Sequence, residues 1–374
     1  MPNLNPVPIR TAMPANQRPG GCTKLILEGI SVNTNRRVIL WERPRYIVPT
    51  ANCFRLETTA TPTPAEGELR IRTAWLGMDS MLYARVQRVS SQQGEPIKLK
   101  EAMVGPAVGR VEESRHPDFK EGELVSGFWE WQDHVISCGK RLRKLDFGIQ
   151  KPSYALGAYG IPGFGAYVAL DRIAPPKAGE TVVVGTALGG LGQTAGQIAK
   201  LKGCRVVGIA GSDEKCELAV RRLGFDACIN HEARDFSRQL MDACPNGIDV
   251  DIETVGGKTL EAIVPLLNIN ARIAACGLMG TPHFGETAFK GRYQNTMSFM
   301  YEIINRRVAV RGLVAFDHLR EKLQDFHRDM RGWIDSEEVR PLEDIVDGLE
   351  NAPAAFQDIF EGRNKGKRVV RVAD

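Results

Sequence analysis

Long hydrophobic runs, clustered cysteines and runs of like charge are all missing from this sequence. No stretch approaches the ~18 consecutive apolar residues of a membrane-spanning helix, and the first residues lack the basic-then-apolar order of a secretory signal. The eight cysteines are far apart, with no pair at C-x-x-C spacing, which argues against a disulfide framework and a cysteine-cluster zinc site. The net charge of +4 is spread along the chain, so nucleic-acid binding is not indicated. We therefore expect a cytoplasmic protein that binds neither membranes nor nucleic acids.

Acidic residues are also missing from the beginning of the chain. Residues 1 to about 35 carry no acid before Glu28 and contain five prolines, which prevent a regular helix. We interpret this segment as a flexible arm. An organellar transit segment is the alternative, although the prolines interrupt the amphipathic helix that such a segment needs. The full length of 374 residues, with 43% apolar residues, favours two folded domains beyond the arm.

Two hydrophobic patterns follow one another along the chain. From Arg37 to about Asp146, short alternating segments such as 69–75 and 123–129 predict mostly antiparallel strands. From about Tyr154, continuous apolar runs alternate with helical stretches, which is typical of parallel βαβ units whose strands are buried on both faces. The predicted fold is α/β, with a doubly wound parallel sheet of the Rossmann type beside a mostly antiparallel domain. A last strand over 367–372 is expected to return to the first domain.

A glycine-rich turn joins the first parallel strand, expected at 181–184, to the following helix. Aligned on the G-x-G-x-x-G fingerprint, Ala187 takes the first place, Gly189 the second and Gly192 the third. The second glycine lets the backbone approach a pyrophosphate, the third lets the helix pack closely on the strand, and the helix N-terminus offers free N–H groups. A tight turn without a ligand is the alternative, but the surrounding βα alternation favours a dinucleotide site.

The end of the next strand indicates which dinucleotide is bound. An NAD-binding protein presents Asp or Glu there to the ribose 2′-hydroxyl, whereas this chain has Ala210-Gly211-Ser212 and then Lys215. A hydroxyl and an ammonium suit the extra 2′-phosphate of NADP. Asp213 and Glu214 are interpreted as helix N-cap residues.

Many further stretches match one family in the same order. They include PDFKEGELVSGFWEWQDH (117–134), LGAYGIPGFGAYVAL (156–170), GQIAKLKGCRVVGIAGSDEKC (196–216), LGFDACINH (223–231) and GRNKGK (362–367). On these stretches the sequence resembles the medium-chain dehydrogenase/reductase superfamily, and within it the zinc-independent double-bond reductases, a group that includes prostaglandin, alkenal and curcumin reductases. The resemblance covers nearly all of the chain from Arg37 to Asp374.

The resemblance implies a domain organisation and a set of partners. After an arm over 1–35, it implies a GroES-like catalytic domain over 36–155 and a Rossmann domain over 156–312. A C-terminal segment over 313–374 then completes the catalytic domain. It also implies a homodimer, bound NADP(H) and a small-molecule substrate.

The resemblance further implies which residues hold the cofactor. The implied set is Ala187, Leu188, Gly189, Gly190, Leu191, Gly192, Gly211, Ser212, Lys215, His231, Thr254, Cys276, Gly277, Leu278, Met279, Gly280, Gly312, Leu313, Val314 and Asn364. The family's usual tyrosine beside the adenosine is His231 here, and its usual asparagine is Thr254.

The zinc ligands of metal-dependent relatives have no counterpart in the corresponding stretches. These read LGMDSM (76–81) and VGPAVG (104–109), without Cys or His, so no metal is expected. Alcohol oxidation that depends on a metal then lacks its Lewis acid. The expected reaction is NADPH-dependent reduction of an activated double bond by hydride transfer to the β-carbon.

The substrate half of the expected site departs from the family pattern. Met81 replaces a substrate-facing tyrosine, and Tyr83 lies two residues further on, on the same face if the segment is a strand and on a different face if it is a helix. Tyr83 and Tyr159 are the catalytic candidates, and Met81, Gly165, His283 and Tyr293 are the pocket candidates. Each has a simpler interpretation as a core, gap-filling or loop residue.

Taken together, these changes predict a reshaped pocket that serves a specialised biosynthetic intermediate. Two alternatives stay open from the sequence. One is a quinone or carbonyl reductase on the same fold. The other is a cofactor-binding protein whose catalysis has lapsed.

Overall fold

The computed structural model describes residues 34–44, 48–87, 95–145, 149–277, 279 and 294–373. The first strand, β1 (Thr34–Leu40), pairs antiparallel with β2 (Phe54–Ala60) in a separate two-stranded sheet. Thr34 and Asn35 were expected in the arm, but their backbones pair with Ala60 and Thr59, so they belong to β1. The rest of the expected arm lies outside the described residues.

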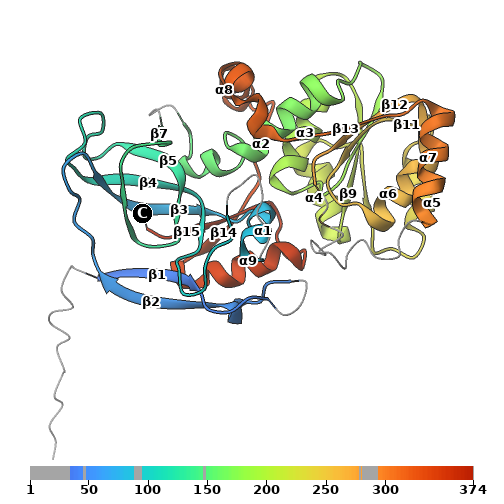
Figure 1. The fold of residues 1–374 in the computed structure, drawn as a ribbon. Helices are drawn as coiled ribbons and strands as arrows, with labels where there is room; N and C mark the ends of the chain where they lie inside the picture. Colours follow the sequence, from blue (N-terminus) through green and yellow to red (C-terminus); the bar gives the residue numbers. More distant parts are fainter. Residues whose placement is uncertain are drawn as a thin grey trace, which may run out of the picture. The chain divides into compact units, whose positions relative to one another are not determined.

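A six-stranded parallel sheet carries the second half of the chain (Figure 1). From one edge to the other its strands are β10 (Ala227–Asn230), β9 (Arg205–Ala210), β8 (Thr181–Val184), β11 (Ile248–Glu253), β12 (Leu267–Ala275) and β13 (Ala309–Gly312). The helices that connect these strands are α3 (Gly190–Leu201), α4 (Asp213–Leu223), α5 (Phe236–Ala243), α6 (Gly257–Ile263) and α7 (Gln294–Arg306).

Apolar side chains cover both faces of this sheet because successive residues of a strand point to opposite sides. Val182 packs in one core cluster with Ile198 of α3, whereas its neighbour Val183 packs in another with Leu240 of α5 and Ile263 of α6. Figure 1 shows α5, α6 and α7 on one side of the sheet and α3 and α4 on the other. The prediction of a doubly wound parallel sheet is confirmed.

A seven-stranded sheet combines the first part of the chain with its end. The path runs β14 (Glu343–Asp347), β15 (Lys367–Arg371), β3 (Leu69–Gly77), β4 (Val104–Ser114), β5 (Leu124–Glu130) and β7 (Arg143–Lys144), and β6 (His134–Ser137) also pairs with β3. All these pairings are antiparallel except that of β14 with β15. In β15, Val369 is level with Gly77 of β3. The expected mostly antiparallel domain is therefore present, with the last strand in its sheet.

Three longer helices and several short ones complete the described structure. The longer ones are α2 (Ile161–Val168), α8 (Leu319–Asp335) and α9 (Ala352–Phe360). The short ones are η1 (Ala51–Cys53), η2 (Ser80–Leu82), α1 (Tyr83–Val86), η3 (Pro152–Leu156), η4 (Ala169–Ile173), η5 (Val264–Leu266), η6 (Ala315–His318) and η7 (Leu349–Asn351). None of the helices in the described ranges has the length and apolar character needed to cross a membrane.

One carboxyl group is fully buried in the parallel sheet. Asp251 of β11 is level with Val183 of β8 and Ile273 of β12, and no described group gives either of its oxygens a hydrogen bond. Burial, with a smaller contribution from the charge of Glu253, raises the pKa of Asp251 well above its ordinary value. The folded chain therefore keeps a proton that the unfolded chain loses near pH ~4.

This buried carboxyl should make stability depend on pH. Between pH ~4 and the folded pKa of Asp251 the unfolded chain binds fewer protons, so the free energy of unfolding should fall as the pH rises. Asp251→Val should remove that component and raise the free energy of unfolding by about 1–3 kcal/mol at about pH 8, with a smaller gain at about pH 5. Urea unfolding at both pH values measures this. Asp242→Asn on α5, whose side chain is exposed, is the control for net charge, and an unaltered pH dependence in Asp251→Val would contradict the prediction.

Candidate functional site

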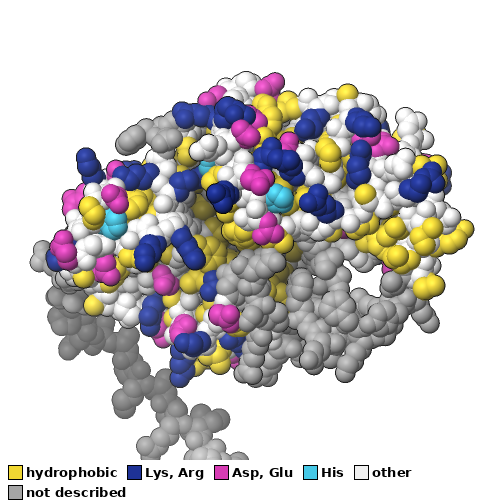
Figure 2. Space-filling view, turned by 45° about the horizontal axis from the view of Figure 1, so that its top comes forward, with side chains coloured by type: hydrophobic (Ala, Val, Ile, Leu, Met, Phe, Trp, Pro, Cys, Tyr) yellow, Lys and Arg dark blue, Asp and Glu magenta, His cyan; other side chains and the backbone are white. Residues whose placement is uncertain are grey.

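A cleft of about 710 Å³ lies between the residues that follow the parallel strands and residues next to the seven-stranded sheet. Its wall combines the glycine turn after β8, the start of α4 and the ends of β11 and β12 with residues 78–81, the start of α2 and the segments 313–316 and 359–368. Figure 2 shows a hollow in the middle of the face, with hydrophobic side chains visible inside it. The carboxyl ends of parallel strands are where α/β proteins bind ligands.

The glycine turn has the geometry that a dinucleotide needs. A Cβ at Gly192 would lie 2.3 Å from the carbonyl oxygen of Thr186 and 2.8 Å from that of Gly185, so only glycine lets α3 approach β8 this closely. Gly189 is the N-cap of α3 and has no side chain to occupy the free N–H groups of the first turn. Ala187, Leu188, Gly189, Gly190 and Leu191 line the cleft, whereas Gly192 packs behind it. The turn therefore presents unpaired N–H groups to an anion.

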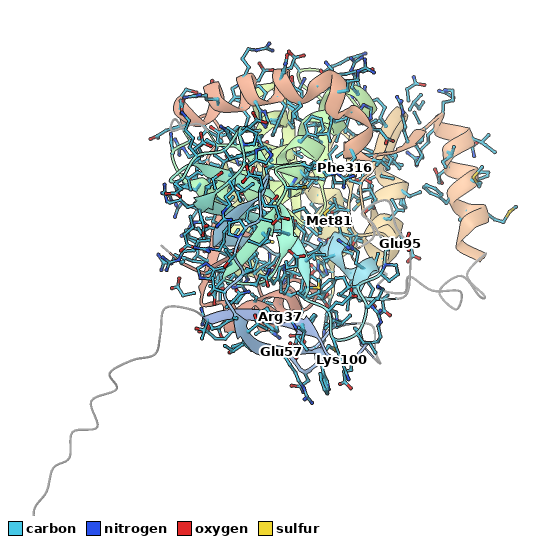
Figure 3. The ribbon with its side chains drawn as sticks, turned by 60° about the vertical axis from the view of Figure 1, so that its left-hand side comes forward. Arg37, Glu57, Met81, Glu95, Lys100 and Phe316 are labelled. Carbon is cyan, nitrogen blue, oxygen red and sulfur yellow. The ribbon has the colours of Figure 1, made fainter. Side chains whose placement is uncertain are left out.

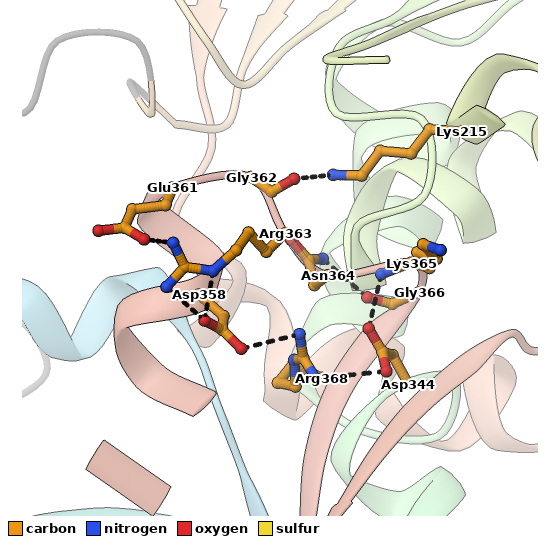
Figure 4. A network of polar contacts seen from close by, with 10 residues as sticks. All are labelled: Lys215, Asp344, Asp358, Glu361, Gly362, Arg363, Asn364, Lys365, Gly366 and Arg368. Carbon is orange, nitrogen blue, oxygen red and sulfur yellow. Dashed lines mark hydrogen bonds and ion pairs between the residues drawn. The ribbon is translucent and has the colours of Figure 1, made fainter. Parts of the chain in front are cut away.

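At the start of α4, Lys215 reaches across to the C-terminal segment. Its ammonium group donates a 2.5 Å hydrogen bond to the carbonyl oxygen of Gly362 (Figure 4). The side chain is largely buried, and this burial lowers the pKa of Lys215 below its ordinary value. Ser212 is the N-cap of α4 and accepts a 3.3 Å hydrogen bond from the backbone N–H of Lys215, so the capping role expected of Asp213 and Glu214 belongs to Ser212. Lys215 lines the cleft; Ser212 does not.

His231 lies beside the loop that precedes α4. A Cβ at Gly211 would be 3.3 Å from its Nε2, and both residues line the cleft. The other ring nitrogen, Nδ1, lies 2.8 Å from Oε1 of Glu232. Burial is the main cause that lowers the pKa of His231, so its ring is neutral at physiological pH. A neutral ring is suited to stack on a base and not to bind a phosphate.

The ends of β11 and β12 form the floor of the cleft. Thr254 Oγ1 lies 2.9 Å from Oγ1 of Thr186, and the carbonyl oxygen of Thr254 accepts a 2.9 Å hydrogen bond from the N–H of Met279. Burial raises the pKa of the Cys276 thiol to about 12, so it stays protonated. Thr254, Cys276, Gly277 and Met279 all line the cleft. Leu278, Gly280, His283 and Tyr293 lie outside the described residues.

Glu253 is a site residue that sequence reasoning missed. Its Oε1 accepts hydrogen bonds from the backbone N–H groups of Val255 at 2.5 Å and Gly256 at 2.8 Å, and this fixes the turn beside Thr254. An acid at the end of a strand, followed by Thr254-Val255 and then by two glycines, is the signal that could have found it.

The C-terminal segment closes another wall. Asn364 lines the cleft, and its side-chain amide donates a 2.8 Å hydrogen bond to the carbonyl oxygen of Gly366. Arg368 donates to Asp344 and Asp358, which fixes this segment against β14 and α9 (Figure 4). Leu313 and Val314 also line the cleft, whereas Gly312 does not.

Lys367 was also missed by the sequence analysis. The ammonium group of Lys367 donates to the carbonyl oxygen of Met78 at 2.9 Å and to Oδ1 of Asp79. Its side chain is 5% exposed. The bonds tie residues 78–79 to β15, which comes from the other end of the chain. A contact between positions so far apart leaves no local pattern in the sequence.

The substrate half of the cleft is mostly apolar. Met81 of η2 and Phe316 of η6 both line it (Figure 3), together with Met78 and Ile161. Gly165 of α2 also lines it, and a Cβ there would meet no atom closer than Cδ1 of Leu191, at 3.4 Å. The cleft can therefore exclude water from an apolar substrate.

The two catalytic candidates of the sequence analysis do not line this cleft. Tyr83 begins the helix α1, its ring packs against that of Phe360, and its buried phenol oxygen accepts a 2.8 Å hydrogen bond from Gln87. Tyr159 is buried in the hydrophobic core, and burial raises its pKa to about 12. Tyr159 is therefore in the position of a core aromatic, and neither phenol is in the wall of the cleft.

Phenylalanine at both positions should therefore leave turnover within about twofold of the wild type, because loss of a donor to the reacting oxygen costs about 10²-fold or more. Steady-state kinetics of Tyr83→Phe/Tyr159→Phe with NADPH and an unsaturated ketone measures this. A hundredfold fall in kcat, with an unaltered melting temperature, would show that one of the two phenols reaches the substrate.

In the described part of the chain, no group of three or more His, Cys, Asp or Glu side chains is arranged to hold a metal ion. The described cysteines, Cys53, Cys138, Cys204, Cys216, Cys228, Cys244 and Cys276, are free thiols.

Two family models match this chain. Residues 36–145 match the N-terminal domain of oxidoreductase, and residues 190–330 match a model described as zinc-binding dehydrogenase. The chain is 43% identical to the NADPH-dependent curcumin reductase of Escherichia coli, over 91% of this chain and 97% of that protein. It is 34% identical to the NADP⁺-dependent 2-alkenal reductase of Nicotiana tabacum, over 81% of this chain and 87% of that protein.

A solved structure shares the whole arrangement. CurA from Vibrio vulnificus, in complex with NADPH, is 42% identical and superposes with a TM-score of 0.85, covering 91% of this chain and 99% of that one. Sequence identity at this level, over nearly the full length of each protein, accompanies the glycine turn and the two sheets described above. The chain belongs to the zinc-independent double-bond reductases of the medium-chain dehydrogenase/reductase superfamily.

Proposed function

We propose that this protein reduces activated carbon–carbon double bonds, those conjugated to a carbonyl group, with NADPH as the reductant. The cofactor cleft is the observation that carries the proposal. It combines a turn in which only glycine fits at position 192 with a buried lysine, Lys215, in the first turn of α4. Relatives that act as NADPH-dependent curcumin reductase and NADP⁺-dependent 2-alkenal reductase support it.

The residues of the cleft fit NADPH. The close contact at Gly192 leaves the first turn of α3 free for the pyrophosphate, and the Lys215 ammonium is the buried cation that a 2′-phosphate needs. His231 would lie beside the adenine, and Thr254, Cys276 and Leu313 would lie along the nicotinamide end. The other cofactor residues implied by the resemblance are proposed for the same site.

The bound cofactor would supply the hydride for the β-carbon of the substrate. The chain itself would orient the alkene between 78–81, α2 and 313–316. Met78, Met81 and Phe316 would exclude water there, which strengthens any hydrogen bond to the oxygen that gains charge. The apolar wall and the space at Gly165 support the proposal of a reshaped pocket for an extended substrate.

NADPH oxidation, followed by absorbance with a panel of enals, enones and quinones, tests this function. Alkene reduction with recovery of the saturated product would support it. Turnover of quinones alone would favour the quinone reductase alternative. Quenching of tryptophan fluorescence by NADPH without turnover of any compound would favour lapsed catalysis.

We also propose that the protein is a cytoplasmic homodimer with the domain limits 36–155, 156–312 and 313–374. The edge strand β13 is exposed along its whole length, and α7, the helix that precedes it in the chain, exposes Met297, Tyr301 and Ile304 by 75, 66 and 69%. In Figure 2 hydrophobic side chains gather at the right-hand end of the face. Pairing of two such edges would cover the strand and the apolar helix face.

Light scattering after size-exclusion chromatography should therefore give twice the chain mass of 41.3 kDa. Ile304→Glu places a charge in the proposed interface and should give a monomer, whereas Glu321→Lys on α8 should not. A monomeric wild type would contradict the proposal.

A further inference from the structure

A double-bond reductase needs a hydrogen-bond donor at the oxygen of its substrate, and the two tyrosine candidates do not line the cleft. When a hydride reaches the β-carbon of an unsaturated ketone, the carbonyl oxygen gains negative charge, and a fixed donor in an apolar cleft stabilises it. The donor must lie in the cleft wall and must not already donate elsewhere.

Most donors in the described wall of the cleft are engaged. Lys215 donates to Gly362, Asn364 donates to Gly366, Lys367 donates to Met78 and Asp79, and Arg368 donates to Asp344 and Asp358. The hydroxyls of Thr186 and Thr254 bond each other at 2.9 Å, at the cofactor side of the cleft.

Among the described hydroxyls of the cleft, Ser80 is the exception. Among the described residues that line the cleft, it has the one side-chain hydroxyl without a described hydrogen-bond partner. The residue is half-buried and begins η2, directly before Met81. Its hydroxyl is therefore available within the apolar half of the cleft.

The backbone around Ser80 is held firmly in place. The N–H of Met78 donates to Arg368 O at 3.1 Å, Lys367 binds both Met78 O and the Asp79 carboxylate, and the N–H of Leu82 donates to Asp79 O at 3.1 Å. Met78 and Met81 pack into one core cluster together with Phe360 of α9. A donor on such a fixed segment needs little reorganisation when charge develops nearby.

We propose that Ser80 is a catalytic residue whose hydroxyl donates a hydrogen bond to the carbonyl oxygen of an unsaturated ketone or aldehyde. This inference rests on the proposed function. In the balanced reaction the β-carbon gains the hydride and the α-carbon gains a proton from water, while NADPH becomes NADP⁺. Ser80 keeps its own proton and only stabilises the charge on the oxygen.

Ser80→Ala tests the role, with 4-phenylbut-3-en-2-one as the substrate. We expect kcat/KM to fall about 10²-fold with an unaltered Kd for NADPH, and we expect Ser80→Thr, which keeps a hydroxyl, to retain most of the activity. Ser336→Ala, the same change at an exposed position after α8, is the control. Retention of wild-type kcat/KM in Ser80→Ala would overturn the inference.

A spectroscopic measurement separates donation from a structural role. In a complex with NADP⁺ and the ketone, the carbonyl stretching frequency should be higher in Ser80→Ala than in the wild type, because the hydrogen bond is lost. An unaltered frequency would overturn the donor role even if activity falls. If the wild type does not reduce the ketone, the proposed function fails together with the inference; if it does, a failure at Ser80 concerns the donor alone.

Discussion

Lys215→Ala should raise the Kd for NADPH about 100-fold and the Kd for NADH by less than about threefold. The difference arises because only NADPH carries the 2′-phosphate, whose charge is unpaired without the ammonium group. Lys215 is buried, and its present partner is a neutral carbonyl oxygen, that of Gly362. A phosphate is therefore a stronger hydrogen-bond partner for the Lys215 ammonium group than this carbonyl oxygen. A 100-fold change corresponds to about 2.7 kcal/mol, within the range measured when one partner of a buried charged pair is removed.

Fluorescence titration of both cofactors measures this selectivity. Lys200→Ala is the matched control, since Lys200 is also in the parallel half of the chain but pairs with Asp226 and does not line the cleft. It should leave both affinities unaltered. Equal losses for NADPH and NADH in Lys215→Ala would show that the 2′-phosphate binds elsewhere.

Gly192→Ala should abolish measurable NADPH binding and lower the free energy of unfolding by about 1–3 kcal/mol or more. The added Cβ would lie 2.3 Å from Thr186 O and 2.8 Å from Gly185 O, and both are backbone atoms that cannot rotate away. The start of α3 must then move away from β8. The N–H groups proposed to bind the pyrophosphate would be displaced by the same movement. A displacement of about 1 Å at a positioning element is enough to cost about 100-fold.

Gly332→Ala is the control for this substitution. Gly332 lies in α8, is exposed, and a Cβ there would meet no atom within 4 Å. Alanine should stabilise that helix by up to about 1 kcal/mol and leave NADPH binding intact. Calorimetric unfolding and NADPH titration of both variants compare the two sites, and wild-type affinity in Gly192→Ala would refute the close-packing argument.

The sequence predicts the parallel half of the fold well because its signals are local. Val182–Val184 is apolar at every position, and the structure has a strand over Thr181–Val184 that is buried on both faces. The small residues Ala187, Gly189, Gly190 and Gly192 predict a turn and a helix start. The reason is steric and local, so the prediction needs no knowledge of the tertiary structure.

The substrate half of the site is less predictable because it is assembled from distant positions. Whether Tyr83 faces the cleft depends on the helix at 83–86, a segment too short to show a period in the sequence. The sequence is equally compatible with Tyr159 as a core residue and as a pocket residue. Only the packing of its neighbours in the folded chain places it in the core. The hydrogen bond from Lys367 to Asp79 joins residues that are far apart in the sequence, and no local pattern around either residue predicts it.

The pairing of β15 with β3 also determines the order in which the two large sheets can be completed during synthesis. The strands of the parallel sheet lie between Thr181 and Gly312, so all of them leave the ribosome before β15 does. The seven-stranded sheet must wait for Lys367–Arg371, because β3 pairs with β15 on that side. Until then the apolar side chains of β3 and the backbone groups at Trp75–Gly77 stay open to other chains. A nascent chain stalled before Lys367 is therefore the form of this protein most in need of a chaperone.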